Sequence, residues 1–220
     1  MSNIYCFQPF EKLPRLNREI VITEKIDGSN AQVCIAPVPH DYDPDSMANL
    51  GIWMRNGLLV RAGSRTRWIR PGKETDNYGF ASWVQDNADE LTKLGVGNHF
   101  GEWWGRGINR AYGLDEKRFS LFNRGRWESS TCSNVLPGVC EVETRSPGPA
   151  CCYVVPILMR TEMKRFDCQR VLDALWNDGS QAAPGFTNPE GIVIYHTASK
   201  QLFKATCQND SLPKSCLTSL

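Results

Sequence analysis

The segment Glu24-Lys25-Ile26-Asp27-Gly28-Ser29-Asn30 separates two apolar, β-branched runs, residues 20–23 and 31–35. Both runs have strand character. Asp27-Gly28 is a turn pair, because glycine accepts a positive φ and aspartate can hydrogen-bond to its own backbone. The pattern therefore predicts a β-hairpin with Lys25 at the end of its first strand. A lysine fixed there can be desolvated and act as a nucleophile, although a solvated strand-end lysine gives the same pattern.

The bulk composition narrows the class of protein. The chain has 220 residues, of which 41% are hydrophobic and 22% are charged, as is typical of a globular protein. The formal net charge is only +1, so any basic surface must be a local patch. No apolar run approaches the ~18 residues that span a bilayer, and the N-terminus lacks the pattern of a signal peptide. We expect a single cytoplasmic domain with no membrane partner.

Nine cysteines are scattered through the chain without a Cys-x-x-Cys pair or a histidine at zinc-site spacing. Free thiols in a reducing cytoplasm are the favoured interpretation. The alternative is a disulfide among the four cysteines that lie closest in sequence, Cys132, Cys140, Cys151 and Cys152.

The remaining periodicity predicts an antiparallel α+β fold. Asn56-Gly57 between apolar runs is a strong hairpin signal. Apolar residues at three- and four-residue steps predict helices. These patterns give strands at 51–55, 58–62, 118–123, 151–158, 190–195 and 201–206, and helices at 78–95 and 167–176. Strands and helices do not alternate as βαβ units, which argues against a doubly wound sheet.

Two further stretches carry charged groups at strand ends. Ser64-Arg65 opens the densest basic stretch, and an arginine fork suits phosphate oxygens, although a solvated loop is the alternative. Arg61, Arg67, Arg70 and Lys73 are candidates for a patch that follows a phosphate backbone. Glu102 stands between a glycine and two tryptophans, where a carboxylate could accept from ribose hydroxyls or could simply be exposed.

Taken together, these motifs resemble the covalent nucleotidyltransferases, a superfamily of RNA ligases, DNA ligases and mRNA capping enzymes. The segment 23–30 is most similar to the ATP-dependent RNA ligases. The resemblance extends from residue 20 to residue 206, and the motifs that carry it are, in order, Lys25-x-Asp27-Gly28, Ser64-Arg65, Gly101-Glu102, Phe119, Glu190-Gly191-Ile192-Val193 and Lys204. It implies an ATP-grasp-like adenylyltransferase domain of two antiparallel sheets flanked by helices.

The resemblance also implies a mechanism. Lys25 would attack the α-phosphate of ATP to give lysyl-AMP, with Arg65 and Lys204 contacting phosphates. AMP would pass to an RNA 5′-phosphate, and a 3′-hydroxyl would displace it. Such a transfer needs an in-line nucleophile and charge neutralisation. Glu190 would bind Mg²⁺ or Mn²⁺ through its water shell, because hard cations prefer oxygen ligands.

Four further positions receive roles by the same resemblance. Glu102 would hold the ribose, and Phe119 would stack on adenine. Glu24 would lie near the adenine edge, and Asn30 would help to position the metal shell or the RNA 5′ end.

Two departures from the family pattern matter. The last motif usually reads Lys-x-Lys, but here it reads Lys204-Ala205-Thr206, and threonine cannot neutralise charge. Lys200 or Lys214 could substitute, or the step that needs the second lysine could be slow. Few residues follow Lys204, so residues 1–220 are expected to form one nucleotidyltransferase domain without a C-terminal OB-fold, which argues against DNA ligases and capping enzymes.

The leading hypothesis is therefore an ATP-dependent RNA ligase. The alternatives are a DNA ligase, a GTP-dependent capping-type enzyme, or a nucleic-acid-binding module that kept the fold without the reaction. RNA ends are the expected partner, in a nicked duplex, an RNA/DNA hybrid or a single strand. A kinase or phosphatase could prepare those ends, as in a phage or bacterial repair system.

Overall fold

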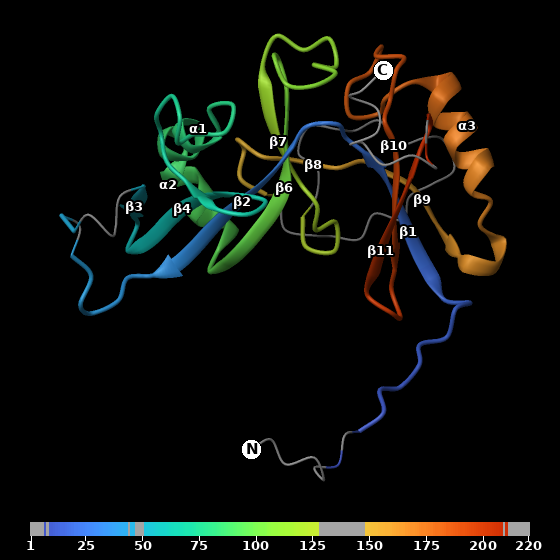
Figure 1. The fold of residues 1–220 in the computed structure, drawn as a ribbon, viewed down its shortest axis with the longest axis horizontal. Helices are drawn as coiled ribbons and strands as arrows, with labels where there is room; N and C mark the ends of the chain where they lie inside the picture. The colour runs from blue at the N-terminus through green and yellow to red at the C-terminus, as the bar shows by residue number, and fades with distance from the viewer. Residues whose placement is uncertain are drawn as a thin grey trace.

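The computed structural model describes residues 7, 9–43, 45–46, 51–127, 148–208 and 210. Its architecture is the predicted α+β one, with two mostly antiparallel sheets and short helices (Figure 1). The strands are β1 Glu19–Lys25, β2 Ser29–Pro37, β3 Ile52–Arg55, β4 Leu58–Ser64, β5 Trp68–Ile69, β6 Gly97–Gly105, β7 Lys117–Leu121, β8 Tyr153–Val154, β9 Ile157–Glu162, β10 Gly191–His196 and β11 Gln201–Thr206. The helices are α1 Phe80–Asp86, α2 Ala88–Leu91 and α3 Cys168–Asp178, with 3₁₀ turns at Thr92–Leu94 and Met163–Arg165.

The smaller sheet has four antiparallel strands in the order β11-β10-β1-β9. Helix α3 covers one face, where Val171 and Leu175 pack against the buried side chains of Ile20, Ile22 and Ile192. Asp167 caps α3 by accepting from the amide of Arg170 at 3.1 Å, and Gly179 ends it with a φ of 83°. The opposite face turns towards the other sheet (Figure 1).

The larger sheet has the order β3-β4-β2-β6-β7-β8, with β5 paired to β4. Alternation along its strands sends one set of side chains into a core with α1 and α2, and the other set to the opposite face. In β2, for example, Val33 and Ile35 are buried while Asn30 is exposed. Rings from α1, β6 and β7 form the centre of this core, with Phe80 stacked on Trp83 at 5.7 Å between ring centroids.

The predicted hairpin around Asp27-Gly28 is wrong. Strand β1 belongs to the smaller sheet and β2 to the larger one, so the two do not pair, and residues 26–28 carry the chain from one sheet to the other (Figure 1). Ile26 is buried beneath this crossing against Trp104 and other residues of a third apolar cluster. Burial of Ile26 between the sheets replaces the turn that local sequence favoured.

Gly28 does not adopt the predicted positive φ. Glycine is required here for a different reason. A Cβ at this position would lie 2.5 Å from the carbonyl oxygen of Trp103 and 2.8 Å from Cβ of Trp104. The crossing therefore requires glycine because two backbone segments approach closely.

Two other predicted elements are divided. The helix expected at 78–95 becomes α1, α2 and a 3₁₀ turn, interrupted at Asn87. The single strand expected at 151–158 becomes β8 in the larger sheet and β9 in the smaller sheet, with Pro156 between them. Proline lacks an amide hydrogen and breaks the ladder. None of the helices in the described ranges is long and apolar enough to cross a membrane.

Candidate active site

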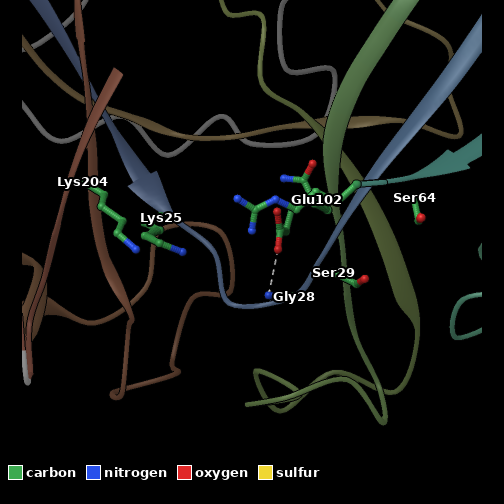
Figure 2. A pocket seen from close by; sticks show the side chains of 8 residues that line it. Lys25, Gly28, Ser29, Ser64, Glu102 and Lys204 are labelled. Atoms are coloured by element: carbon green, nitrogen blue, oxygen red, sulfur yellow. Dashed lines mark hydrogen bonds between the residues drawn. The ribbon is translucent and has the colours of Figure 1, made fainter. Parts of the chain in front are cut away.

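A pocket of about 380 Å³ opens where the two sheets meet. Figure 2 shows Lys25 and Lys204 on one side of it, and Gly28, Ser29 and Glu102 on the other. The smaller sheet supplies the two lysines from β1 and β11, and the larger sheet supplies the remaining polar groups. The lining residues are Lys25, Gly28, Ser29, Asn30, Ser64, Arg65, Glu102 and Lys204.

Lys25 is held by a carboxylate that comes just before the neighbouring strand, β10. Its Nζ lies 2.7 Å from Oε2 of Glu190, and the side chains are 21% and 3% exposed. The register explains the contact, because Lys25 pairs with Gly191, the residue after Glu190. The Lys25 side chain is thus partly buried and still reaches the pocket, as a nucleophilic lysine must.

Glu102 faces Lys25 across the pocket. Its Oε1 accepts from the amide of Gly28 at 3.1 Å, shown by the dashed line in Figure 2. Burial raises the pKa of Glu102 to about 7, against the lowering effect of the Lys25 charge and of this hydrogen bond. The charges of Glu190 and Asp27 raise the pKa further, so three carboxylates lie close to one lysine.

Lys204, Arg65 and Asn30 complete the polar lining, and all three are exposed. Of these, Asn30 pairs with Glu102 across the β2–β6 ladder. The five predicted residues Lys25, Asn30, Arg65, Glu102 and Lys204 therefore come together in one pocket, although four different strands and the segment after β4 supply them.

Thr206, which stands where the family pattern has a second lysine, bonds to a carboxylate instead. Its amide donates to Oδ1 of Asp210 at 2.8 Å, and its hydroxyl donates to the same oxygen at 3.2 Å. Lys200 lies in the turn between β10 and β11 and does not line the pocket. Lys214 lies outside the described residues.

Glu24 does not line the pocket. It is 1% exposed, and its carboxylate accepts from the Ser180 hydroxyl at 2.5 Å and from the amides of Gln181 and Ala182 at 2.8 and 2.9 Å. Burial nevertheless raises the pKa of Glu24, because desolvation outweighs these bonds. Its carboxylate fixes the 180–182 segment against β1.

Phe119 does not line the pocket either. It is 0% exposed and packs in the core 5.0 Å from the ring of Phe80. The ring on the opposite face of this chain segment is Phe122, which is 41% exposed. Neighbouring side chains in a strand point to opposite faces, so Ser120 and Phe122 share the face of Glu102, with which Ser120 pairs. The sequence alternation placed Phe119 and Phe122 on opposite faces but did not indicate which face was open.

A loop that the sequence reasoning missed holds the turn after Lys25. Asn109 Nδ2 donates to Oδ1 of Asp27 at 3.0 Å and to the Gly28 carbonyl at 2.8 Å. The hydroxyl of Tyr112 accepts from the amide of Asp27 at 2.8 Å. Arg110 Nε lies 3.1 Å from Oδ2 of Asp27.

Arg110 also reaches the segment that carries Glu190. Its Nη1 donates to Oδ1 and to the carbonyl of Asn188, at 2.7 and 2.9 Å. Asn109, Ala111 and Tyr112 all have φ between 45° and 55°, a costly conformation for residues other than glycine. We name residues 109–112 the clamp loop. Its only signal in the sequence is a polar pair between Gly107 and Gly113.

A protein-family model covers most of the chain. The family model described as RNA ligase matches residues 18–206. The chain belongs to the RNA ligase family. No curated protein sequence matches it at a significant level.

RNA ligase folds of known structure resemble this one. An apo mutant of Naegleria gruberi RNA ligase has 17% identity and a TM-score of 0.50, over 93% of this chain and 52% of that one. Two mutants of the same ligase with ATP and Mn have 16% and 18% identity and TM-scores of 0.50 and 0.51, covering 92% and 88% of this chain and 51% of theirs. At this identity the likeness shows the fold. The chain spans about half the length of those ligases.

The carboxylates of this RNA ligase fold suit a hard divalent cation. No group of three or more His, Cys, Asp or Glu side chains within the described ranges could hold a metal alone. Mg²⁺ is usually bound by one or two carboxylates, with water and substrate phosphates completing the shell. Glu190 does not itself line the pocket, but it is buried beside Lys25, which does, and so fits that pattern.

Proposed function

We propose that this protein is an ATP-dependent RNA ligase that joins 5′-phosphate and 3′-hydroxyl RNA ends through lysyl-AMP. The observation that carries the proposal is Lys25, a partly buried amine 2.7 Å from Glu190, at a pocket that also holds Arg65 and Lys204. Three cationic side chains around one pocket suit a triphosphate. Membership of the RNA ligase family, and the ATP and Mn in related solved structures, support the choice of substrate and metal.

In the first step, Nζ of Lys25 attacks the α-phosphorus of ATP. A P–N bond forms, the P–O bond to pyrophosphate breaks, and pyrophosphate and a proton leave. Arg65 and Lys204 neutralise phosphate charge, and little further covalent chemistry is needed from the protein. A divalent cation held at Glu190 would supply further charge neutralisation. Glu190 also orients the amine through their ion pair.

In the second step, an oxygen of the RNA 5′-phosphate attacks the same phosphorus, the P–N bond breaks and Lys25 takes back a proton. The RNA then carries an adenylylated 5′ end. In the third step the 3′-hydroxyl attacks the 5′-phosphate, AMP leaves and a phosphodiester bond forms. Asn30 lines the pocket and is exposed, and it would help to position the metal shell or the incoming 5′ end.

The nucleoside is held by the larger sheet. Glu102 lies on the open face of β6, where its carboxylate would accept hydrogen bonds from the ribose hydroxyls. In its protonated form the carboxyl group could also donate a hydrogen bond to a ribose hydroxyl. We assign adenine stacking to Phe122 in place of Phe119, because Phe119 is fully buried. Glu24 would support this site indirectly, through the 180–182 segment.

The test is labelling with α-³²P ATP and Mg²⁺, followed by a denaturing gel. The protein should first be treated with pyrophosphate to remove bound AMP. We expect an acid-labile labelled band that Lys25→Ala abolishes and that Lys164→Ala, which removes an exposed lysine far along the chain, leaves unchanged. Absence of label in the treated wild-type protein would refute the proposal and favour a non-catalytic nucleic-acid-binding module.

Nucleotide and strand choice separate the remaining alternatives. Label from GTP in preference to ATP would indicate a capping-type enzyme, and joining of DNA but not RNA ends would indicate a DNA ligase. Nicked duplexes, RNA/DNA hybrids and single strands should be compared as substrates. Ends that need a kinase or phosphatase before joining would support such a partner.

Cellular location and domain content are part of the proposal. The cysteines at 34, 151, 152, 168 and 207 are free, which is consistent with a reducing cytoplasm. We assign the catalytic nucleotidyltransferase domain to the region that the family model matches, residues 18–206.

A further inference from the structure

The open face of the larger sheet, opposite to α1 and α2, carries a row of aromatic side chains next to the pocket. The pairing register runs from Trp68 to Gly63, from Gly63 to Gln32 and from Gln32 to Phe100. Phe122 follows, because its amide donates to the carbonyl of Phe100 at 3.0 Å. Directly paired residues project from the same face of a sheet, so all five belong to one row.

The three rings of this row are solvated. Trp68, Phe100 and Phe122 are 43%, 51% and 41% exposed, whereas Ile69 and Leu121, their neighbours in sequence, are at most 3% exposed. Single exposed apolar residues need no explanation, but an aligned set beside a pocket marks a binding surface. The row lies two residues along β2 and β6 from Asn30 and Glu102, which is about 7 Å at the usual strand rise. It is therefore continuous with the pocket.

Positive charge and a polar group accompany the rings. The guanidinium of Arg61 lies 4.6 Å from the centre of the Trp68 ring, and its Nε has no hydrogen-bond partner among the described residues. Residues 61–73 contain five cations and no Asp or Glu, and one of the five, Arg65, lines the pocket. The amide of Gln32 lies over Gly63, where it can bond to a base edge.

We propose that this row, which we name the aromatic row, continues from the adenine site at Phe122 into a stacking platform, formed by Trp68 and Phe100, for the RNA strand whose 5′-phosphate enters the pocket. Bases stack on Trp68 and Phe100, and Arg61 contacts the backbone. Exposed rings on a sheet with nearby arginines are the usual means of binding single-stranded nucleic acid. The proposal rests on the proposed ligase function, and it adds where the strand that donates the 5′ end lies.

The test measures binding of a 5′-phosphorylated, fluorescein-labelled single-stranded RNA by anisotropy, with lysyl-AMP formation measured on the same preparations. Trp68→Ala and Phe100→Ala should each weaken RNA binding about tenfold, because stacking on one ring typically contributes that much. Trp68→Phe should retain most of the affinity. The matched control is Phe203→Ala, which removes a 57% exposed ring from the other sheet and should change affinity less than twofold.

The two readouts separate the two proposals. Lysyl-AMP formation does not involve RNA, so it should stay within about twofold of wild type in all these variants, which also shows that they fold. Wild-type RNA affinity in both Trp68→Ala and Phe100→Ala would overturn the platform while leaving the ligase intact. If the wild-type protein forms no lysyl-AMP but the two alanine variants lose RNA binding, the platform would be supported and the ligase function refuted. Tighter binding of a DNA strand of the same sequence would overturn the assignment to RNA.

Discussion

Replacing Arg110 with alanine should slow lysyl-AMP formation without weakening ATP binding. Arg110 ties Asp27, two residues after the nucleophile, to Asn188, two residues before Glu190. Its side chain is 25% exposed and does not line the pocket. The clamp loop thus aligns a lysine and a carboxylate that come from different strands, and removing Arg110 should loosen that alignment.

The size of the effect follows from the lost contacts. Arg110→Ala removes a hydrogen-bonded ion pair and three further hydrogen bonds, each from a charged donor, the longest being 3.5 Å to the Pro189 carbonyl. Bonds of this kind contribute about 1.5–3 kcal/mol each, but partial exposure reduces the total, so we expect a loss of about 2–3 kcal/mol of unfolding free energy. A displacement of about 1 Å at a reacting atom can cost 10²-fold in rate. We therefore expect the rate constant to fall about 10- to 100-fold, with the KM for ATP within about threefold of wild type.

The assay is single-turnover labelling with α-³²P ATP over a range of concentrations, with urea denaturation of each variant. Arg106→Ala, which removes an exposed arginine just before the clamp loop, is the control and should behave as wild type. Arg110→Lys keeps the charge but not the fork, so it should recover only part of the rate. A wild-type rate constant in folded Arg110→Ala, or a change confined to KM, would refute the role of the clamp loop.

Four other substitutions test the site. Burial raises the pKa of Glu102 from 4.5 to about 7, so between pH 4.5 and pH 7 the folded protein binds a proton that the unfolded chain does not. The contribution of Glu102 to stability is therefore greatest below pH 4.5 and is lost as the pH rises through 7. Urea denaturation should therefore show wild-type stability falling, relative to Glu102→Gln, by about 2–3 kcal/mol from pH 5 to 8, and parallel curves would contradict the raised pKa. Phe119→Ala should lower the unfolding free energy by about 3–5 kcal/mol, because it leaves a cavity in the core. Phe122→Ala should leave stability nearly unchanged and raise the KM for ATP about tenfold. The opposite pattern would return the adenine-stacking role to Phe119. Gly28→Ala should lower the thermal stability of the protein and slow labelling at least tenfold, because the added Cβ would lie 2.5 Å from the Trp103 carbonyl oxygen. Wild-type stability and labelling rate in this variant would show that the two backbone segments can separate.

Much of the site could be predicted from the order of motifs along the chain. Lys25, Arg65, Glu102 and Lys204 were each ambiguous alone, yet all four line the pocket. Strand periodicity also gave the positions of β1, β2, β10 and β11 within a few residues, because alternation of buried and exposed side chains is a local property of the chain.

The faces of those strands could not be predicted in the same way. Alternation in β7 separates Phe119 from Phe122, but only the packing of α1 on the sheet makes the Phe119 side the buried one. In the same way, Glu24 reads as a polar neighbour of the nucleophile, and its carboxylate is instead bound by the 180–182 segment, 156 or more residues away in sequence.

The sequence by itself determined the α+β class, the family and the chemical groups of the pocket, because each depends on residue identity and short spacings. The tertiary structure alone decided that Asp27-Gly28 crosses between two sheets and that the clamp loop holds this crossing. The free energy that local turn propensity contributes is small compared with that of burying Ile26, and Gly28 approaches Trp103 closely in the crossing. The contacts of Arg110 with Asp27 and Asn188 join residues about 80 positions apart, and no local pattern encodes such pairs.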